Sequence, residues 1–130
     1  MAGKRESIEI PGMGHGAPIP MGSKIGNMVY SSGISGHDTE RNIMPQDPDE
    51  QAANLFKNIR TFMEQAGGTP EDIIRATVLI KDRAHLGSIN KEWLKMFPDE
   101  HSRPARHALE TEVRAGGALF QIELVAVLAQ

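Results

Sequence analysis

Apolar residues recur at intervals of three and four between residues 47 and 68, a spacing that places them along one side of a helix. Asp47 is suited to cap this helix, Pro48 to occupy its first position, and Glu50 to complete a capping box. Gly67 and Gly68 end it, because glycine readily adopts the left-handed conformation that closes a helix. Its predicted buried side consists of Ala52, Leu55, Phe56, Ile59, Phe62, Met63 and Ala66.

A second amphipathic segment runs from Ala84 to Phe97 and predicts another helix. Its apolar stripe consists of Leu86, Ile89, Trp93 and Phe97. Asn90 falls inside the same stripe. A buried amide needs hydrogen-bond partners, so Asn90 either belongs to a site that supplies them or lies at the edge of the stripe.

Other segments have the composition of β-strands. Ile74 to Lys81 and the final run from Leu119 to Ala129 carry apolar residues on both faces, which is typical of strands inside a sheet. Met28 to Ser32 and Arg106 to Val113 are further predicted strands. A first edge strand is expected near Ile8, before a loop rich in glycine and proline.

The order of strands, helix, strand, helix and strands predicts a single α+β domain over residues 1–130, with one mixed sheet and two helices on one face. Two helices cover only one face, whereas the strand segments Thr77 to Ile80 and Ile122 to Leu128 carry apolar residues on both. We therefore expect a homo-oligomer that packs sheet face against sheet face. A site at the subunit boundary is expected for the same reason.

The composition narrows the classes of function. The chain has 130 residues, no cysteine, and a net charge of −3 from 14 Lys and Arg against 17 Asp and Glu. Five histidines show no metal-ligand spacing and thiolates are absent, so we expect no metal and no other cofactor. The acidic balance and few aromatic residues argue against a nucleic-acid partner. No segment resembles a signal or membrane-spanning sequence, so a soluble cytoplasmic protein is expected.

The last quarter of the chain holds the candidate chemistry. Arg103 and Arg106 flank Pro104-Ala105, where proline favours an extended backbone. An arginine held there presents a planar fork to a carboxylate, such as that of a small 2-imino or 2-oxo acid. The alternative is a structural salt bridge to Glu110, Glu112 or Glu123. We expect antiparallel neighbouring strands to bring this arginine beside the polar start of the final strand.

Gln121 and Glu123 lie two residues apart on that final strand and therefore share one face. A glutamate near a bound anion could activate water for attack on an imine carbon. A glutamine can only orient water, because it has no basic form in the working range.

Two glycine-containing segments supply further candidates. Gly33 follows a β-rich run, and its amide is either an oxyanion donor at a close backbone approach or part of a plain strand end. His15 lies between two glycines and is either a site residue or a free surface histidine. His37 and Asp38 lie in a polar turn and are expected to face solvent.

Several segments together resemble the RidA (YjgF) family over nearly the whole length after residue 15. They are Gly26-Asn27-Met28-Val29-Tyr30-Ser31-Ser32-Gly33, Ala66-Gly67-Gly68-Thr69-Pro70-Glu71-Asp72-Ile73, Asn90, Pro104-Ala105-Arg106 and Ile122-Glu123-Leu124-Val125-Ala126-Val127. The resemblance implies a chorismate-mutase-like α+β fold and a homotrimer with a site in each of three clefts between subunits. Archetypal members hydrolyse reactive 2-imino or enamino acids to 2-oxo acids and ammonia.

The resemblance also implies roles for individual residues. Arg106 matches the arginine that binds the substrate carboxylate, Gly33 the backbone contact beside it, and Asn90 the helix asparagine that lines the cleft. The anion-binding half of the family's site is therefore present in this sequence.

Three positions depart from the family's pattern. Gln121 stands where archetypal RidA has the water-activating glutamate, Ala108 where many members have a cysteine, and Ile19 where they have a tyrosine. The water-activating half of the site is therefore altered. The chain is similar to a divergent branch of the family.

Three functions from different classes follow. The first is an enzyme in which Gln121, assisted by His15, positions water for deamination of an imine or a related unsaturated amino acid. The second is a holdase-like module that captures small carboxylates through Arg106 without turnover. The third is the ribonuclease or translation-inhibitor activity named for parts of the family, which the acidic balance disfavours.

Overall fold

The computed structural model describes residues 4–14, 16–113 and 116–129. Four short strands come first, followed by a long helix, a strand, a second helix and two final strands. The elements are β1 (Glu6–Ile8), β2 (Gly22–Ile25), β3 (Met28–Ser31), β4 (Ile34–Ser35), α1 (Pro48–Ala66), the 3-10 turn η1 (Pro70–Asp72), β5 (Ile73–Ile80), the 3-10 turn η2 (Arg83–His85), α2 (Leu86–Met96), β6 (Ala105–Glu110) and β7 (Phe120–Val127).

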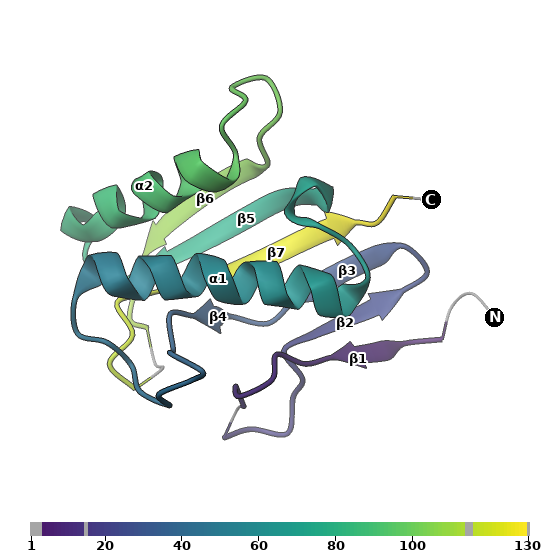
Figure 1. The fold of residues 1–130 in the computed structure, drawn as a ribbon, viewed down its shortest axis with the longest axis horizontal. Coiled ribbons are helices and arrows are strands. Elements are labelled where there is room, and N and C mark those ends of the chain that lie inside the picture. The colour runs from purple at the N-terminus through teal and green to yellow at the C-terminus, as the bar shows by residue number, and fades with distance from the viewer. Residues whose placement is uncertain (1–3, 15, 114–115, 130) are drawn as a thin grey trace.

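The strands of the described residues form one seven-stranded mixed sheet in the order β1-β2-β3-β7-β5-β6, with β4 also paired to β7. β5 lies between β7 and β6, so its predicted central position is confirmed. β5 and β6 run parallel, and the other pairs are antiparallel. Both helices lie across the same face of the sheet (Figure 1). The predicted α+β fold, a mixed sheet with two helices on one face, is therefore confirmed.

The helix α1 begins and ends where the sequence predicts, but its capping box is only half formed. The Asp47 side chain accepts a hydrogen bond from the Glu50 N–H at 2.9 Å, and Pro48 occupies the first turn. The Glu50 carboxylate does not return to the cap, because it accepts a hydrogen bond from Arg41 at 2.5 Å. At the other end Gly67 has a φ of 91°, which only glycine adopts at little cost.

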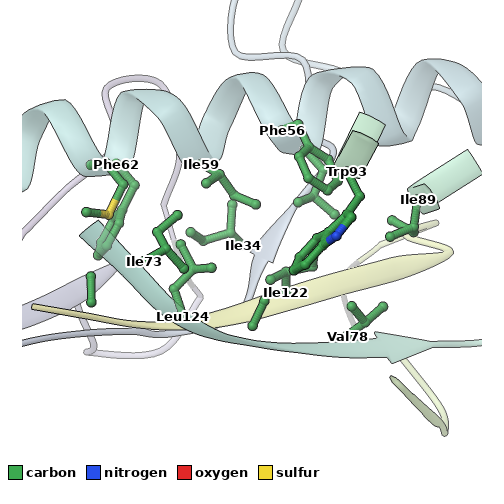
Figure 2. Packing of buried hydrophobic residues seen from close by; sticks show 14 of the residues in the cluster. Ile34, Phe56, Ile59, Phe62, Ile73, Val78, Ile89, Trp93, Ile122 and Leu124 are labelled. Carbon is green, nitrogen blue, oxygen red and sulfur yellow. The ribbon is translucent and has the colours of Figure 1, made fainter. Parts of the chain in front are cut away.

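The hydrophobic core fills the space between the sheet and the two helices (Figure 2). The helices contribute Phe56, Ile59 and Phe62 from α1, and Ile89 and Trp93 from α2. The sheet side of the core includes Ile34, Ile73, Val78, Ile122 and Leu124. Burial of each large apolar side chain stabilises the fold by about 1.5–3 kcal/mol, so the inward positions of β5 and β7 are committed to packing.

The buried side chain of Gln51 ties two loops to α1. Its Nε2 donates to the carbonyls of Pro45 at 2.6 Å and Gly117 at 3.0 Å, and its Oε1 accepts from the Leu119 N–H at 2.9 Å. The backbone of Gly36 packs so closely against the same turn that a side chain there would clash with the Gln51 carbonyl. The start of β7 and the turn after β4 are thus fixed to one turn of α1.

The opposite face of the sheet carries no helix within the described residues (Figure 1). It presents the outward residues of β3, β5, β6 and β7, among them Tyr30, which is 58% exposed, and Leu109, which is 40% exposed. Leu79, Val125 and Val127 are half-buried on the same face. The second face therefore carries apolar side chains next to polar ones such as Glu123 and His107, and its burial in an oligomer stays a prediction.

Two predicted strands are shorter in the structure. The strand expected up to Val113 ends at Glu110, where its partner β5 also ends at Ile80. The strand expected up to Ala129 ends at Val127, which pairs with the first residue of β3. In both cases the length of the neighbouring strand sets the limit, because a strand needs a partner for its backbone hydrogen bonds.

Neither helix within the described residues has the length and apolar character needed to cross a bilayer. No group of three or more potential metal-binding side chains gathers in the described part of the chain. The expectations about compartment and cofactors remain predictions.

Replacing Gln51 with methionine is expected to lower the free energy of unfolding by about 2–4 kcal/mol, because the Leu119 N–H and two carbonyls lose a buried partner while side-chain volume is kept. Urea unfolding followed by circular dichroism measures this change. Gln65→Met, at an exposed glutamine of the same helix, is the matched control and should change the value by less than about 0.5 kcal/mol. A Gln51→Met protein as stable as the wild type would contradict the structural role of these hydrogen bonds.

Candidate functional site

The link between β3 and β4 is a β-bulge against β7. Both strands pair with the same edge of β7, but residues 31–33 between the paired positions face only residues 123–124. The Ser31 hydroxyl accepts a hydrogen bond from the Leu124 N–H at 2.8 Å, which satisfies a backbone donor at the interruption. Such bulges redirect the chain and are frequent beside functional sites.

Gly33, the last residue of this bulge, packs against the side chain of Gln121. A Cβ atom at Gly33 would lie 3.0 Å from the Gln121 Oε1, closer than side chains normally approach one another. The structure therefore brings these two predicted site residues together. It also gives the reason for a glycine here, which is close contact with Gln121.

Gln121 lines a hollow of about 490 Å³ at the end of the sheet. One wall comes from the glycine-rich loop through Gly14 and Gly16, and another from Ser35 at the end of β4 and His37 just after it. Ser35 pairs directly with Gln121 in the sheet. The hollow is thus built within one chain, around the polar start of β7.

His37 does not simply face solvent, so that expectation is wrong. Its ring Nε2 lies 2.9 Å from the Oδ1 of Asn42. Its carbonyl accepts a hydrogen bond from the buried amide of Asn58 at 2.9 Å, and its N–H donates to the Ser35 hydroxyl at 3.4 Å. Asn58 also donates to the Ser35 carbonyl at 2.9 Å, so this one side chain of α1 holds the segment in place.

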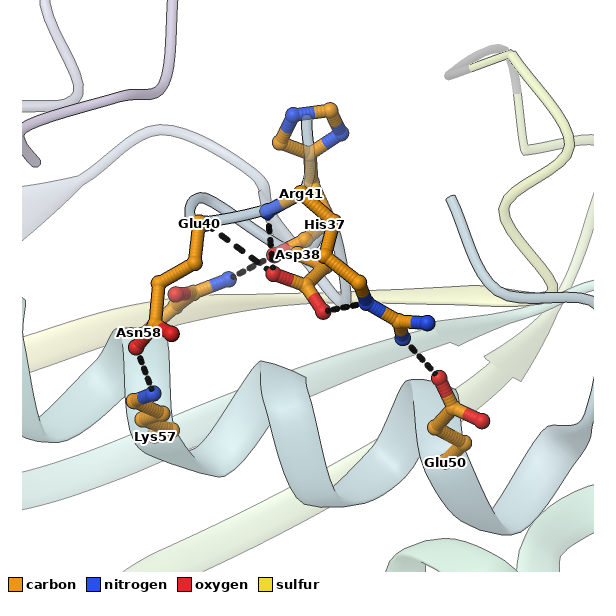
Figure 3. Close-up of polar contacts among 7 residues, drawn as sticks. All are labelled: His37, Asp38, Glu40, Arg41, Glu50, Lys57 and Asn58. Atoms are coloured by element: carbon orange, nitrogen blue, oxygen red, sulfur yellow. Dashed lines mark hydrogen bonds and ion pairs between the residues drawn. The ribbon is translucent and has the colours of Figure 1, made fainter. Parts of the chain in front are cut away.

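A network of ion pairs fastens the turn after His37 onto α1 (Figure 3). Arg41 donates from Nε to Asp38 at 2.7 Å and from Nη2 to Glu50 at 2.5 Å. Asp38 also accepts the backbone N–H groups of Glu40 and Arg41, each at 3.0 Å. Lys57 of α1 pairs with Glu40 at 3.0 Å. Together these contacts determine where the turn sits relative to the helix.

Arg106 lies on the helix-covered face of the sheet, over the ring of Trp93. Its Cζ is 4.9 Å from the ring centroid, a cation–π contact worth about 0.5–2 kcal/mol. Phe97 packs against the same ring with centroids 4.8 Å apart. Burial lowers the pKa of the Arg106 guanidinium, but the ordinary pKa of arginine is so high that the group stays charged.

The Nη1 of Arg106 is buried and has no hydrogen-bond partner among the described residues. A buried charged donor without a partner is costly, so the position is suited to an anion that accepts its hydrogen bonds. No ion pair within the described residues joins Arg106 to a glutamate of β6 or β7. The geometry therefore favours the anion-binding interpretation of this arginine over a structural salt bridge.

Arg103 has a different role from Arg106. Its Nε donates to the Phe97 carbonyl at 2.9 Å and its Nη2 to the Pro98 carbonyl at 3.3 Å. These bonds hold the connection that follows α2. Arg103 is thus occupied by backbone acceptors, which neither the carboxylate-binding nor the salt-bridge alternative anticipates.

Asn90 is exposed on α2 and lies one turn before Trp93. It therefore lies at the edge of the apolar stripe, as one of the two alternatives expects. It is on the same helix as Trp93, the residue whose ring Arg106 contacts. The helix itself begins at Leu86, later than predicted, because residues 83–85 form the 3-10 turn η2.

Ile19 is 50% exposed, and it precedes Pro20, whose carbonyl accepts a hydrogen bond from the Ser32 hydroxyl of the bulge at 2.9 Å. Ile19 is therefore the sequence neighbour of Pro20, which is hydrogen-bonded to Ser32, the residue before Gly33. His15 lies outside the described residues.

Arg106 and Gln121 lie on opposite faces of the sheet. Arg106 shares the helix-covered face with its partner Ala76 and with Leu124, whereas Gln121 pairs with Leu79 on the other face. Their backbones are separated by two strand spacings, which is about 10 Å across the sheet, and by the distance from Ala76 to Leu79, which is about 10 Å along the strands. The expectation that neighbouring strands bring them together is wrong, because β5 lies between β6 and β7.

A model of the family described as Endoribonuclease L-PSP matches residues 20–128, a span that includes Gly33, Asn90, Arg106 and Gln121. The chain belongs to the endoribonuclease L-PSP family. Solved structures of similar proteins agree with this assignment. RidA from the Antarctic bacterium Psychrobacter sp. PAMC 21119 is 26% identical with a TM-score of 0.86, over 95% of this chain and 99% of that chain.

Two proteins of E. coli are also similar to this L-PSP family chain. The YjgF gene product is 26% identical with a TM-score of 0.83, over 94% of this chain and 98% of that one. TdcF with bound serine is 26% identical with a TM-score of 0.85, over 95% of this chain and 99% of that one. The resemblance to the RidA family inferred from the sequence is thereby confirmed.

Sequence reasoning missed two residues of the hollow in this L-PSP family chain, His37 and Asn42. No short spacing pattern links them to Gln121, because the sheet brings together positions more than 70 residues apart in the sequence. One signal was available. Asn58 falls within the apolar stripe of α1, between Leu55 and Phe62, and a buried amide there requires partners from another segment.

Hydrogen bonds from the backbone and side chain of Arg41 lower the pKa of Asp38 from 3.8 to about 2. Because the folded pKa lies below the unfolded one, this stabilisation is complete above about pH 4 and is lost as the pH falls through about 2. Thermal unfolding between pH 5 and pH 2 should therefore show a smaller acid-induced loss of stability in Asp38→Asn than in the wild type.

Glu64→Gln, at an exposed carboxylate of α1, is the control for removal of one charge and should retain the acid dependence of the wild type. Identical profiles for the wild type and Asp38→Asn would contradict the anchoring role of Asp38.

Proposed function

We propose that this protein hydrolyses small reactive 2-imino or enamino acids to 2-oxo acids and ammonia, with the substrate carboxylate held by Arg106. One observation carries the proposal: the Arg106 Nη1 is buried over Trp93 without a hydrogen-bond partner among the described residues. A carboxylate presents two oxygens in the geometry of the guanidinium fork, so it satisfies this donor and neutralises the charge in one contact.

The surroundings of Arg106 favour a small ligand. The cation is half-buried, and its neighbour on the helix is the single tryptophan of the chain. TdcF, which is 26% identical to this chain, has bound serine, a small molecule with a carboxylate next to a carbon that bears nitrogen. That observation supports an amino-acid-derived substrate. The net charge of −3 offers little attraction for a polyphosphate chain, so RNA is disfavoured.

The opposite placement of Arg106 and Gln121 supports a site shared between two copies of the chain. One copy contributes Arg106 and Asn90, and the next contributes Gly33 and Gln121. In a homotrimer this arrangement forms three equivalent clefts, since each subunit supplies both halves to different neighbours. The apolar sheet face that includes Tyr30 is the surface available for such packing.

Within this cleft Gln121 orients the attacking water through its amide, and Gly33 offers its backbone as a contact for the substrate. Ile19 lines the cleft where archetypal members have a tyrosine. His15, which lies between two glycines in the sequence, is proposed as a further substrate-binding residue. No metal or other cofactor enters the proposed reaction, which needs only water as a second reactant.

A second candidate is the capture of small carboxylates without turnover, in the manner of a holdase. Gln121 favours this alternative, because an amide cannot act as a base. Both functions use Arg106 in the same way. Ribonuclease activity is the weakest of the three, and a cytoplasmic location is the setting proposed for either leading function.

The first experiment follows the loss of 2-iminopropionate and 2-iminobutyrate generated in place by an amino-acid oxidase or dehydratase. The wild type should accelerate this loss. Arg106→Ala should lower kcat/KM by about 10²- to 10⁴-fold, because a bidentate charge-assisted contact to the carboxylate is removed. Arg60→Ala, at an exposed arginine of α1, is the matched control and should change kcat/KM by less than about twofold.

The same variants separate the two leading functions. If the wild type is inert, but 2-oxobutyrate binds to it and not to Arg106→Ala in calorimetry, the protein is a carboxylate-binding module. Gain of hydrolysis in Gln121→Glu would then show that only the base is lacking. Equal activity in the wild type and Arg106→Ala would contradict the role of Arg106 in either function.

The shared site also predicts the oligomeric state. Light scattering at micromolar concentration should give a mass of about three times the 14.2 kDa of one chain. Tyr30→Asp should shift the protein towards the monomer by placing a charge on the apolar sheet face, whereas Gln65→Asp on the exposed side of α1 should not. A monomeric wild type would overturn both the trimer and the shared cleft.

A further inference from the structure

We propose that His37 is the general base that activates water in the hollow beside Gln121. The inference rests on the proposed function and adds to it the proton acceptor that Gln121 cannot supply. His37 and Gln121 line the same hollow of about 490 Å³. Among the described residues that line this hollow, His37 is the only one with an acid–base side chain.

The contact with Asn42 determines which ring nitrogen acts as the base. The Asn42 Oδ1 lies 2.9 Å from the His37 Nε2, and an amide oxygen can only accept a hydrogen bond. This contact assigns the hydrogen to Nε2 and leaves the lone pair on Nδ1. A base whose second nitrogen is oriented by a neighbouring acceptor is the arrangement that hydrolytic sites use to position histidine.

The position of His37 is fixed by contacts that do not involve its ring. Its carbonyl is held by Asn58 at 2.9 Å and its N–H by Ser35 at 3.4 Å. Asn42 has a φ of 56°, in the left-handed region that few residues other than glycine and asparagine adopt. Arg41 pins the turn that contains Asn42 to α1 (Figure 3). A side chain held in this way can be substituted without loss of the turn.

The nearby carboxylates do not compete for this role. Asp38 accepts hydrogen bonds from Arg41 and from the Glu40 N–H, and Glu40 pairs with Lys57. Neither carboxylate is among the residues that line the hollow. In Figure 3 the ring of His37 points away from α1, whereas these ion pairs lie towards the helix.

In the proposed step, a water molecule oriented by the Gln121 amide attacks C2 of the imino acid. The His37 Nδ1 accepts a proton from this water as the C–O bond forms, and the electron pair of the C=N bond moves to nitrogen, which takes a proton from solvent. The resulting carbinolamine gives its hydroxyl proton to solvent as the C–N bond breaks. The leaving nitrogen receives the proton held by His37. The products are the 2-oxo acid and ammonia.

The test uses imine hydrolysis by the wild type, His37→Gln and His37→Ala. His37→Gln keeps a hydrogen-bond donor for Asn42 but removes the base, so kcat should fall by about 10²- to 10⁴-fold. KM should change little, because Arg106 still holds the carboxylate. Added imidazole should restore activity to His37→Ala, which a purely structural role does not allow. His101→Gln, at an exposed histidine, is the matched control with wild-type kinetics.

A mixed oligomer tests whether His37 and Arg106 serve one substrate from different copies. Co-expression of His37→Ala and Arg106→Ala chains in equal amounts should recover roughly a quarter of wild-type activity, since one interface in four then contains both intact residues. Each variant alone should remain inactive.

The outcomes separate this inference from the proposed function. If Arg106→Ala is inactive but His37→Gln keeps a kcat within about threefold of the wild type, His37 is not the base and the proposed function stands. A His37→Ala protein that imidazole does not restore also overturns the role of base. A wild type that does not hydrolyse imines overturns both proposals.

Discussion

The alternation of side chains along a strand is the constraint on which the site depends. Every second residue of β7, and of β5 from Ala76 onward, is buried in the core beneath the helices, so polar chemistry on these strands must use the other face. Gln121 lies on that other face. Arg106 is on the core side, but on the edge strand β6, where Trp93 covers it and the residue stays partly exposed. The sheet therefore keeps the cation apart from the polar hollow within one chain.

Buried amides of α1 organise the side of the sheet that holds the hollow. Gln51 holds the segment leading into β7, and Asn58 holds the segment leading out of β4. Both side chains lie among the apolar residues of the helix, and each meets several backbone groups of loops that would otherwise be buried without partners. The walls of the hollow are loops, yet their positions follow from the helix.

The two halves of the site differ in their electrostatics. Arg106 is a partly desolvated cation with a donor left unpaired among the described residues, which favours an anion at that position. Among the described residues, the hollow near Gln121 is lined by glycines, two methionines, hydroxyl and amide groups and one histidine, and the ion pairs around Arg41 lie outside its walls. The charged carboxylate of a substrate would thus lie beside the Arg106 cation, and its neutral reacting carbon would lie in the hollow near Gln121. This division is the physical basis for placing substrate binding and water activation on separate surfaces.

The sequence by itself determined the α+β class, both helices, the Asp47 cap and the Gly67 end of α1, the central place of β5 and the membership of the family. These features follow from local periodicity, capping chemistry and motifs that are contiguous in the chain. Only the tertiary structure decided that Arg106 and Gln121 lie on opposite faces, that Arg103 binds carbonyls, and that His37 enters the hollow. Strand order and register determine these spatial positions of residues far apart in sequence. No local sequence pattern predicts which strands become neighbours.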